Sequence, residues 1–324
     1  MKKDYKIAIC YICLIVICLL MFAFSNDMIN SLFKKNPLED NLYVNFLGNK
    51  NSNSYRKAHK LVKHLRQKGV KTYFNTKDNS KTGNINLYIA NTDLDTDIGL
   101  DSNAINILWI PYISPNEDYS LFRKFDVVIV KSIPSYSHLK AINVRTAYIP
   151  DAFDVKLNNY KYKKDSAYWG DNTRQSLALN LAKDKKIDIF GKKWHRTIYH
   201  RKVVKNDNVK LSDFKDYAIV LVDQDDRDDI AKELVNDNII ELISAGFVPF
   251  IRYNEGIKAI FKNTVPMYYN PDDFHNKYEN LINNKNKISN IRENIYNIAK
   301  KWDSSSQADK FIEIFSIMQK KRIK

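Results

Sequence analysis

The segment 233–253 reads ELVNDNIIELISAGFVPFIRY and joins a predicted helix to a predicted strand. The helical part repeats apolar residues at the spacing of one buried helix face, at Ile239, Ile240, Leu242 and Ile243. Asn236 or Asp237 is a candidate N-cap, and Gly246 ends the helix. The apolar run 247–253 follows at once as a strand. A helix that leads directly into a buried strand predicts an α/β fold.

The N-terminal end of this helix is a candidate binding site for a diphosphate. Free backbone N–H groups and a partial positive charge gather at such an end. Asn238 lies in the predicted first turn, and Glu241 lies further along, where its carboxylate can accept hydrogen bonds from ribose hydroxyls. We therefore expect Asn238 and Glu241 to contribute to a nucleotide site.

Strand and helix patterns alternate along the chain before this segment, in two series. The expected strands are 41–48, 85–90, 105–110, 125–130, 166–170, 187–191 and 217–223, and the expected helices are 55–68 and 173–183. Such alternation predicts parallel sheets that are covered on both faces. We expect an α/β protein with two Rossmann-like domains facing a cleft, where ligands bind beyond the carboxyl ends of the strands.

The N-terminal run Ile7–Phe24, IAICYICLIVICLLMFAF, carries no charge and is just long enough to cross a bilayer core. It predicts one transmembrane helix, and the alternative is a cleaved signal peptide. All three cysteines lie in this run, so we expect no disulfide and no thiol nucleophile in the remaining chain. Lysines flank the run on both sides, and no N-x-S/T sequon occurs, which leaves the side of the membrane open.

The formal net charge of +15 requires an anionic partner or a tolerant surface. Zinc-finger spacing, RNP-like aromatic motifs and recognition-helix signatures are absent from the sequence, so we expect no nucleic-acid partner. A basic chain beside a membrane anchor fits an anionic lipid surface better. The lysine-rich end KKRIK at 320–324 is either a solvated tail or a lipid contact.

Seven residues separate Glu233 from Glu241, and the phrase LISAGFVPFI follows. This segment resembles the E-x7-E element of the retaining GT-B glycosyltransferases known as glycosyl transferases group 1. The resemblance implies that Glu241 binds the donor ribose and that Glu233 lies near the donor sugar as the catalytic candidate. The chain departs from the family pattern between the two glutamates, where LVNDNII replaces a glycine-rich filler.

The segment 168–194, YWGDNTRQSLALNLAKDKKIDIFGKKW, resembles the start of the C-terminal domain in the spore-maturation-protein-like branch of these enzymes. By that match Arg174 is a ligand of the donor phosphate, which suits a guanidinium. Gly170 and Asn172 belong to the loop that faces the donor, and Gly191 belongs to a second loop beside it.

The resemblance also implies a division of the chain into three regions. We expect a membrane anchor and stem at 1–35, an N-terminal Rossmann-like acceptor domain at 36–157 and a C-terminal nucleotide-sugar domain at 158–324. The last region ends in helices over 287–324, interrupted at 303–306. Lys131, Ser132 and Asp151 fall at expected strand ends of the acceptor domain.

The sequence thus predicts a membrane-anchored glycosyltransferase that moves a sugar from a nucleotide-diphosphate donor to a glycan or lipid-linked acceptor, with retention. We expect no cofactor and no metal, because the acidic run 223–229 lacks EF-hand spacing. Two alternatives remain open. One is an inverting, fucosyltransferase-like GT-B enzyme, and the other is an inactive GT-B scaffold or sugar-binding protein at the membrane.

Overall fold

The computed structural model describes residues 40–50, 52–76, 81–90, 98–111, 113, 119–156, 162–171, 177–194, 203–205, 207–223 and 234–322. Asp40–Lys324 forms one unit by its internal contacts. Among the described residues no helix is both long and apolar enough to cross a membrane. The run Ile7–Phe24 lies outside those residues, and so do the site candidates Asn172, Arg174 and Glu233.

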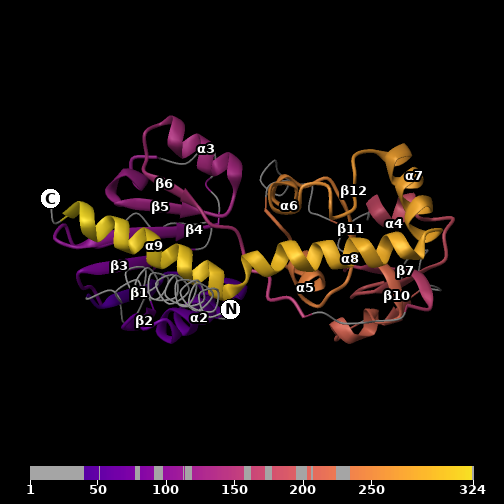
Figure 1. The fold of residues 1–324 in the computed structure, drawn as a ribbon, viewed down its shortest axis with the longest axis horizontal. Coiled ribbons are helices and arrows are strands. Elements are labelled where there is room, and N and C mark those ends of the chain that lie inside the picture. Colours follow the sequence, from indigo (N-terminus) through magenta and orange to yellow (C-terminus); the bar gives the residue numbers. More distant parts are fainter. Residues whose placement is uncertain are drawn as a thin grey trace, which may run out of the picture. The chain divides into compact units, whose positions relative to one another are not determined.

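The first sheet consists of six described parallel strands in the order β2-β1-β3-β4-β5-β6 (Figure 1). Their bounds are β1 (Leu42–Phe46), β2 (Thr72–Thr76), β3 (Ile85–Ile89), β4 (Ile105–Ile110), β5 (Val127–Val130) and β6 (Thr146–Tyr148). The expected strands β1, β3, β4 and β5 are confirmed. The sequence analysis missed the two edge strands, because β2 exposes Tyr73 instead of forming a continuous apolar run and β6 has three residues.

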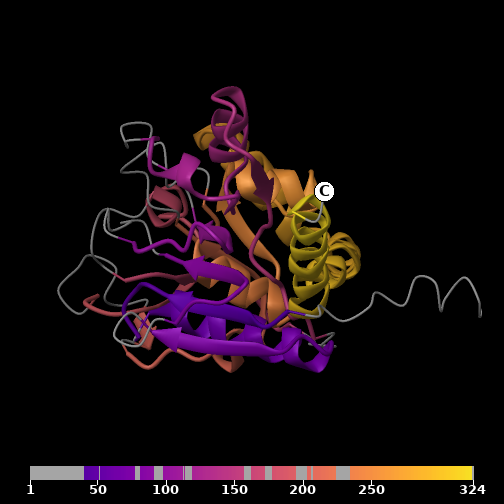
Figure 2. The same ribbon diagram turned by 90° about the vertical axis from the view of Figure 1, so that its left-hand side faces the viewer.

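Helices cover both faces of this sheet. They are α2 (Asn53–Gln67), α3 (Ile133–Ala141) and α9 (Ser304–Arg322), with a short 3-10 turn η2 (Phe122–Lys124). Leu139 of α3 packs with Leu108 of β4 on one face. The next residue of β4, Trp109, points to the opposite face and contacts Phe311 of α9 with ring centroids 5.1 Å apart. Helix α2 lies beside α9 on that face (Figures 1 and 2).

The second sheet also has six described parallel strands, in the order β12-β11-β10-β7-β8-β9. Their bounds are β7 (Lys164–Trp169), β8 (Ile187–Phe190), β9 (Val203–Lys205), β10 (Tyr217–Val222), β11 (Pro249–Arg252) and β12 (Met267–Tyr268). The interior strands β7, β8, β10 and β11 are those that the sequence predicted. The described chain thus consists of two α/β units, each a parallel sheet covered by helices, which are called here the first and the second layer. This arrangement confirms the expected α/β fold class for the described residues.

The helices of this second layer are α4 (Leu177–Leu181), α5 (Asp237–Ser244), α6 (Glu255–Phe261), α7 (Pro271–Ile282) and α8 (Lys285–Ala299), with a 3-10 turn η4 (Leu211–Phe214). Alternate residues of β10 divide between two cores. Val220 packs with Ile239 and Leu242 of α5 in one core. Leu221 packs with Phe274 of α7 in the other. The amphipathic pattern quoted from the sequence therefore fixes α5 against one face of the second sheet.

The chain returns to the first sheet at its end. A 3-10 turn η5 (Lys300–Trp302) separates α8 from α9, and Asp303 Oδ1 accepts a hydrogen bond from the Ser306 N–H at 2.7 Å. The interruption expected at 303–306 therefore lies slightly earlier, because these polar residues begin a helix instead of breaking one. The sequence analysis assigned 158–324 to the second domain, whereas α9 packs on the first sheet beside α2.

Candidate functional site

A buried lysine–aspartate pair lies at the carboxyl edge of the first sheet. Strands β5 and β6 are parallel neighbours, so the residues that follow each strand meet at the same edge. Lys131 follows β5 and Asp151 lies beyond the end of β6, and Lys131 Nζ is 2.7 Å from Asp151 Oδ1. The two side chains are only 9% and 14% exposed. Because burying charges is costly, such a pair persists only where its geometry is well formed.

Lys57 of α2 extends this pair to the second layer. Its Nζ lies 3.2 Å from Asp151 Oδ2 and 2.8 Å from Oδ1 of Asp237, the first residue of α5. Asn53 Nδ2 also donates to Asp237. Lys131, Asp151, Lys57 and Asp237 form a continuous line of alternating charges, named here the Lys–Asp chain. This chain connects the edge of the first sheet to the N-terminus of α5.

The Lys–Asp chain shifts the pKa values of its members. Burial alone would raise the pKa of Asp151, but Lys131 and Lys57 lower it to about 2. Burial lowers the pKa of Lys131, against the opposing effect of Asp151. For Lys57, burial acts to lower the pKa, but Asp151 and Asp237 outweigh it and raise the value. For Asp237, burial acts to raise the pKa, and Lys57 and Asn53 bring it below its usual value.

Glu241 lines a cavity of about 510 Å³ beside the Lys–Asp chain. Lys57 and Lys60 of α2 line the same cavity, together with Lys156 from the connection between the sheets and Ser244 of α5. Lys60 forms an ion pair with Asp154, and Asp154 also accepts hydrogen bonds from Ser304. Elements from both layers therefore line the cavity of Glu241, and the lining holds three lysines together with Asp151 and Asp154.

The Glu241 side chain is exposed and forms no hydrogen bond or ion pair with any described residue. Partial burial and the nearby charge of Asp237 raise its pKa, while Arg56 and Lys57 act in the opposite direction. A carboxylate that lines a cavity and has no partner among the described residues is available to accept hydrogen bonds from a ligand.

Gly170 and Gly191 lie at the carboxyl ends of the neighbouring parallel strands β7 and β8. Gly191 has φ +148°, and a Cβ atom at this position would lie 1.9 Å from the Gly170 carbonyl oxygen. The same oxygen accepts a hydrogen bond from Trp194 Nε1 at 2.7 Å, and the Lys192 N–H donates to Asp171 Oδ1 at 2.7 Å. The two loops expected from the sequence are therefore in direct contact, and only glycine fits at Gly191.

The N-terminus of α5 follows the carboxyl end of β10, at the same edge of the sheet as these loops. Asn236 is the N-cap, and its Oδ1 accepts a hydrogen bond from the Asn238 N–H at 2.8 Å. Asp237 faces Lys57. In the first turn, which is expected to bind a diphosphate, the Asn238 N–H is therefore already bonded to the side chain of the N-cap Asn236. A diphosphate bound there would replace Asn236 Oδ1 as the acceptor of that hydrogen bond.

Of the expected site residues, the structure places Gly170 against Gly191 and places Asn238 and Glu241 on one helix. No described contact joins the glycine pair Gly170 and Gly191 to Glu241. The glycine pair and the start of α5 lie at the same edge of the second sheet. Asn172, Arg174 and Glu233 lie outside the described residues. Their assigned roles, like those of the described candidates, stay predictions.

Sequence reasoning noted Lys131 and Asp151 as strand ends but did not join them, and it missed Lys57. Lys57 occurs on an amphipathic helix rich in exposed basic residues, so no local pattern distinguishes it from its neighbours.

Within the described residues, no group of three or more His, Cys, Asp or Glu side chains could hold a metal ion. Of the acidic run 223–229, residues 224–229 lie outside the described chain.

No protein-family model and no curated protein sequence matches the chain. Solved structures do match it. A glycosyltransferase from Rickettsia africae is similar over 87% of this chain and 99% of its own, with a TM-score of 0.63 and 12% identity. An α-glucosyltransferase in complex with UDP-glucose and DNA containing an abasic site is similar over 86% and 99%, with a TM-score of 0.56 and 10% identity.

A third similar structure is the α,α-trehalose 6-phosphate synthase from Burkholderia multivorans, matched over 75% of this chain and 72% of its own, with a TM-score of 0.52 and 10% identity. These proteins share the two-layer architecture described above. The chain therefore has the GT-B fold that its sequence predicted, and the comparisons do not distinguish the spore-maturation-protein-like branch.

Proposed function

We propose that this GT-B protein is a glycosyltransferase that transfers a sugar from a nucleotide-diphosphate donor to an acceptor hydroxyl. The observation that carries the proposal is the position of Glu241. Its carboxylate faces a lysine-lined cavity from the helix that begins at the carboxyl end of β10. Ligands of open α/β sheets bind at that edge.

The donor binds through two kinds of contact in this proposal. The Glu241 carboxylate accepts hydrogen bonds from the ribose hydroxyls. The diphosphate lies at the N-terminus of α5, where backbone N–H groups and the helix dipole favour negative charge. Arg174 supplies the guanidinium, and the loops with Gly170, Asn172 and Gly191 allow the donor to approach the backbone closely.

In the transfer step, the bond between the anomeric carbon and the phosphate oxygen breaks as the acceptor oxygen bonds to that carbon. The nucleoside diphosphate leaves with the bonding electron pair, and the acceptor proton passes to its phosphate oxygen. Groups that stabilise the departing charge supply most of the rate, so the α5 N-terminus and Arg174 carry that role. Glu233 is the proposed carboxylate beside the donor sugar, with a retaining outcome.

We further propose a glycan or lipid-linked acceptor, and a membrane location through Ile7–Phe24. The α-glucosyltransferase neighbours are described with both UDP and DNA, so the expected lack of a nucleic-acid partner needs its own test. The inverting enzyme and the inactive scaffold are the alternatives to be separated by experiment.

The test is turnover by the full chain with UDP-, GDP- and ADP-sugars, each with a glycan, a lipid-linked sugar or a DNA oligonucleotide as acceptor. Release of one nucleoside diphosphate that depends on one acceptor, and that falls at least a hundredfold in Glu241→Ala, supports the proposal. The anomeric configuration of the product separates retention from inversion. A folded protein that releases none of the three nucleotides contradicts the transferase proposal.

A further inference from the structure

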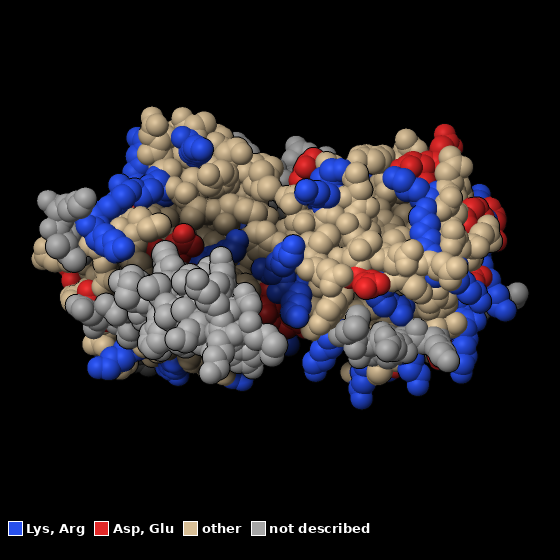
Figure 3. Space-filling model, in the orientation of Figure 1, with Lys and Arg blue, Asp and Glu red and all other residues tan. Residues whose placement is uncertain are grey.

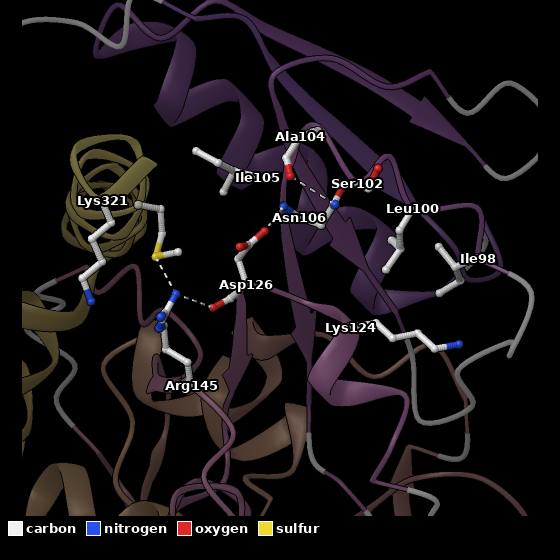
Figure 4. Close-up of a pocket in the computed structure, with 11 residues that line it drawn as sticks. Ile98, Leu100, Ser102, Ala104, Ile105, Asn106, Lys124, Asp126, Arg145 and Lys321 are labelled. Carbon is white, nitrogen blue, oxygen red and sulfur yellow. Dashed lines mark hydrogen bonds between the residues drawn. The ribbon is translucent and has the colours of Figure 1, made fainter. Parts of the chain in front are cut away.

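A second cavity, of about 760 Å³, lies at the amino edge of the first sheet, at the opposite end of the strands from the Lys–Asp chain (Figure 4). Residues that precede or begin β4, β5 and β6 line it, among them Asn106, Asp126 and Arg145. Lys321 of α9 and Lys124 of η2 complete the rim. The site proposed for sugar transfer does not include this cavity.

The rim is cationic. Figure 4 shows Lys321, Arg145 and Lys124 arranged around the cavity from three different elements. All three side chains are exposed, and none forms an ion pair with a described carboxylate. Among the described residues, the Arg145 guanidinium hydrogen-bonds only to the Asp126 carbonyl oxygen, at 3.4 Å, and to the Met318 sulfur, at 3.9 Å. Most of its N–H groups therefore remain available to an anion.

Asp126 is the one carboxylate among the described lining residues, and one of its oxygens already accepts a hydrogen bond from the backbone. Its Oδ2 accepts a hydrogen bond from the Asn106 N–H at 2.8 Å. The described lining thus holds three cationic side chains and one partly satisfied carboxylate, so the cavity favours an anionic ligand. Ile98, Leu100 and Met318 supply an apolar part of the lining. A phosphate group attached to an apolar moiety matches this combination.

The position of the cavity favours a membrane lipid as the source of such a ligand. Asp40, the first described residue, accepts a hydrogen bond from Gln319 of α9 at 2.8 Å, so the N-terminal segment joins the described chain at this edge. Residues 25–39 can extend over about 55 Å at most. If Ile7–Phe24 crosses the bilayer as its sequence predicts, the amino edge of the first sheet stays within that distance of the membrane.

The surface around the cavity is also basic and partly apolar. Arg123, Lys320 and Lys321 are exposed near it, and Ile317 of α9 exposes 46% of its surface. In Figure 3, Lys and Arg atoms gather at the left-hand end, where Figure 1 places the end of α9. Basic side chains beside an exposed apolar residue suit an anionic lipid interface.

We propose that this cavity binds the phosphate of an anionic phospholipid headgroup and holds the amino edge of the first sheet against the membrane surface. The ligand chemistry is a phosphate ester, and free phosphate is the competing source. The proposal rests on the proposed membrane location of the chain and not on the transferase activity, because it involves none of the residues proposed to bind the donor.

Hydrogen–deuterium exchange of the full chain on nanodiscs tests the proposal. One set of nanodiscs contains phosphatidylcholine alone, and the other contains about 30% phosphatidylglycerol. We expect backbone amides of 98–104 and 316–321 to exchange at least threefold more slowly on the anionic nanodiscs. The triple variant Lys124→Gln, Arg145→Gln, Lys321→Gln should lose this protection.

A matched triple variant, Lys215→Gln, Lys285→Gln, Lys301→Gln, changes the net charge equally at exposed positions elsewhere and should keep the protection. Cooperative urea unfolding of both triple variants shows that they are folded. Equal exchange on the two kinds of nanodisc overturns the proposal, and so does equal loss of protection in both triple variants. Protection by inorganic phosphate on phosphatidylcholine nanodiscs overturns the lipid assignment in favour of a free anion.

Discussion

Lys57 Nζ lies 2.8 Å from Asp237 Oδ1, so an ion pair joins the helix beside the first sheet to the helix that carries Glu241. Lys57 also contacts Asp151, and through it the buried Lys131. The residue therefore connects the two layers beside the cavity that Glu241 lines. This relationship makes several consequences measurable.

Replacing Lys57 with methionine removes the charged group and its ion pairs while keeping most of the length of the side chain. We expect the free energy of unfolding to fall by about 1 kcal/mol, because both partners of the Lys57–Asp237 pair are partly exposed. Nucleotide affinity should fall as well, since Lys57 lines the cavity of Glu241. Urea denaturation and calorimetry measure the two effects. Lys63→Met on the exposed side of the same helix should change neither.

Acid should weaken the fold through Asp151. Its pKa is about 2 in the folded chain against an ordinary 3.8, so this carboxylate contributes stability above pH 3.8 that is lost as the pH falls towards 2. The shift corresponds to about 2 kcal/mol. Urea unfolding between pH 5 and pH 2 measures the loss. Asp151→Asn should be less stable throughout, because Lys131 is left buried and unpaired, and its stability should fall less steeply with acid. Equal slopes for the two proteins would show that Asp151 does not carry this dependence.

Gly191→Ala tests the contact between the two glycine loops. The added methyl group would lie 1.9 Å from the Gly170 carbonyl oxygen, at a φ that side chains rarely adopt. We expect a loss of roughly 2–4 kcal/mol in the free energy of unfolding and weaker nucleotide binding. Gly99→Ala is the control, since a Cβ atom there meets nothing within 4 Å. Similar melting temperatures for both variants would contradict the described geometry.

Phe311→Ala tests the return of the last helix to the first sheet. Phe311 is fully buried and contacts Trp109 of β4, so its truncation should cost about 3–4 kcal/mol. Ile317→Ala on the same helix should stay within about 0.5 kcal/mol, because Ile317 is exposed. Chemical denaturation compares the two variants. A small effect of Phe311→Ala would mean that α9 does not complete the core of the first sheet.

The interior strands could be predicted from the sequence because buried parallel strands are continuous apolar runs, as in β4 and β10. Helix α5 could be predicted because its apolar period, cap and closing glycine agree. The Lys–Asp chain could not, since it joins Lys57, Lys131, Asp151 and Asp237 across large sequence separations. The packing of α9 on the first sheet could not be predicted either, because helical periodicity shows which face of a helix is buried but not which sheet it packs against.

The residues proposed for the donor site come in part from the sequence pattern and in part from the family resemblance. The close approach of Gly191 to Gly170 follows from the loops that the sequence identified. The cavity around Glu241 required the fold, because its lysines come from α2 and from the connection between the layers. Helical position alone shows neither which side chains face Glu241 nor that its carboxylate has no described partner.

The most direct test of the central claim is calorimetric titration of the full chain with UDP, GDP and ADP, beside Glu241→Ala and Glu293→Ala. Glu293 is an exposed glutamate on α8, away from the cavity lining, and serves as the matched control. We predict that one nucleotide binds with micromolar affinity, that Glu241→Ala weakens this binding at least tenfold and that Glu293→Ala leaves it unchanged. Binding that is equally strong in Glu241→Ala, or no binding of any nucleotide by the folded chain, would contradict the assignment of the donor site.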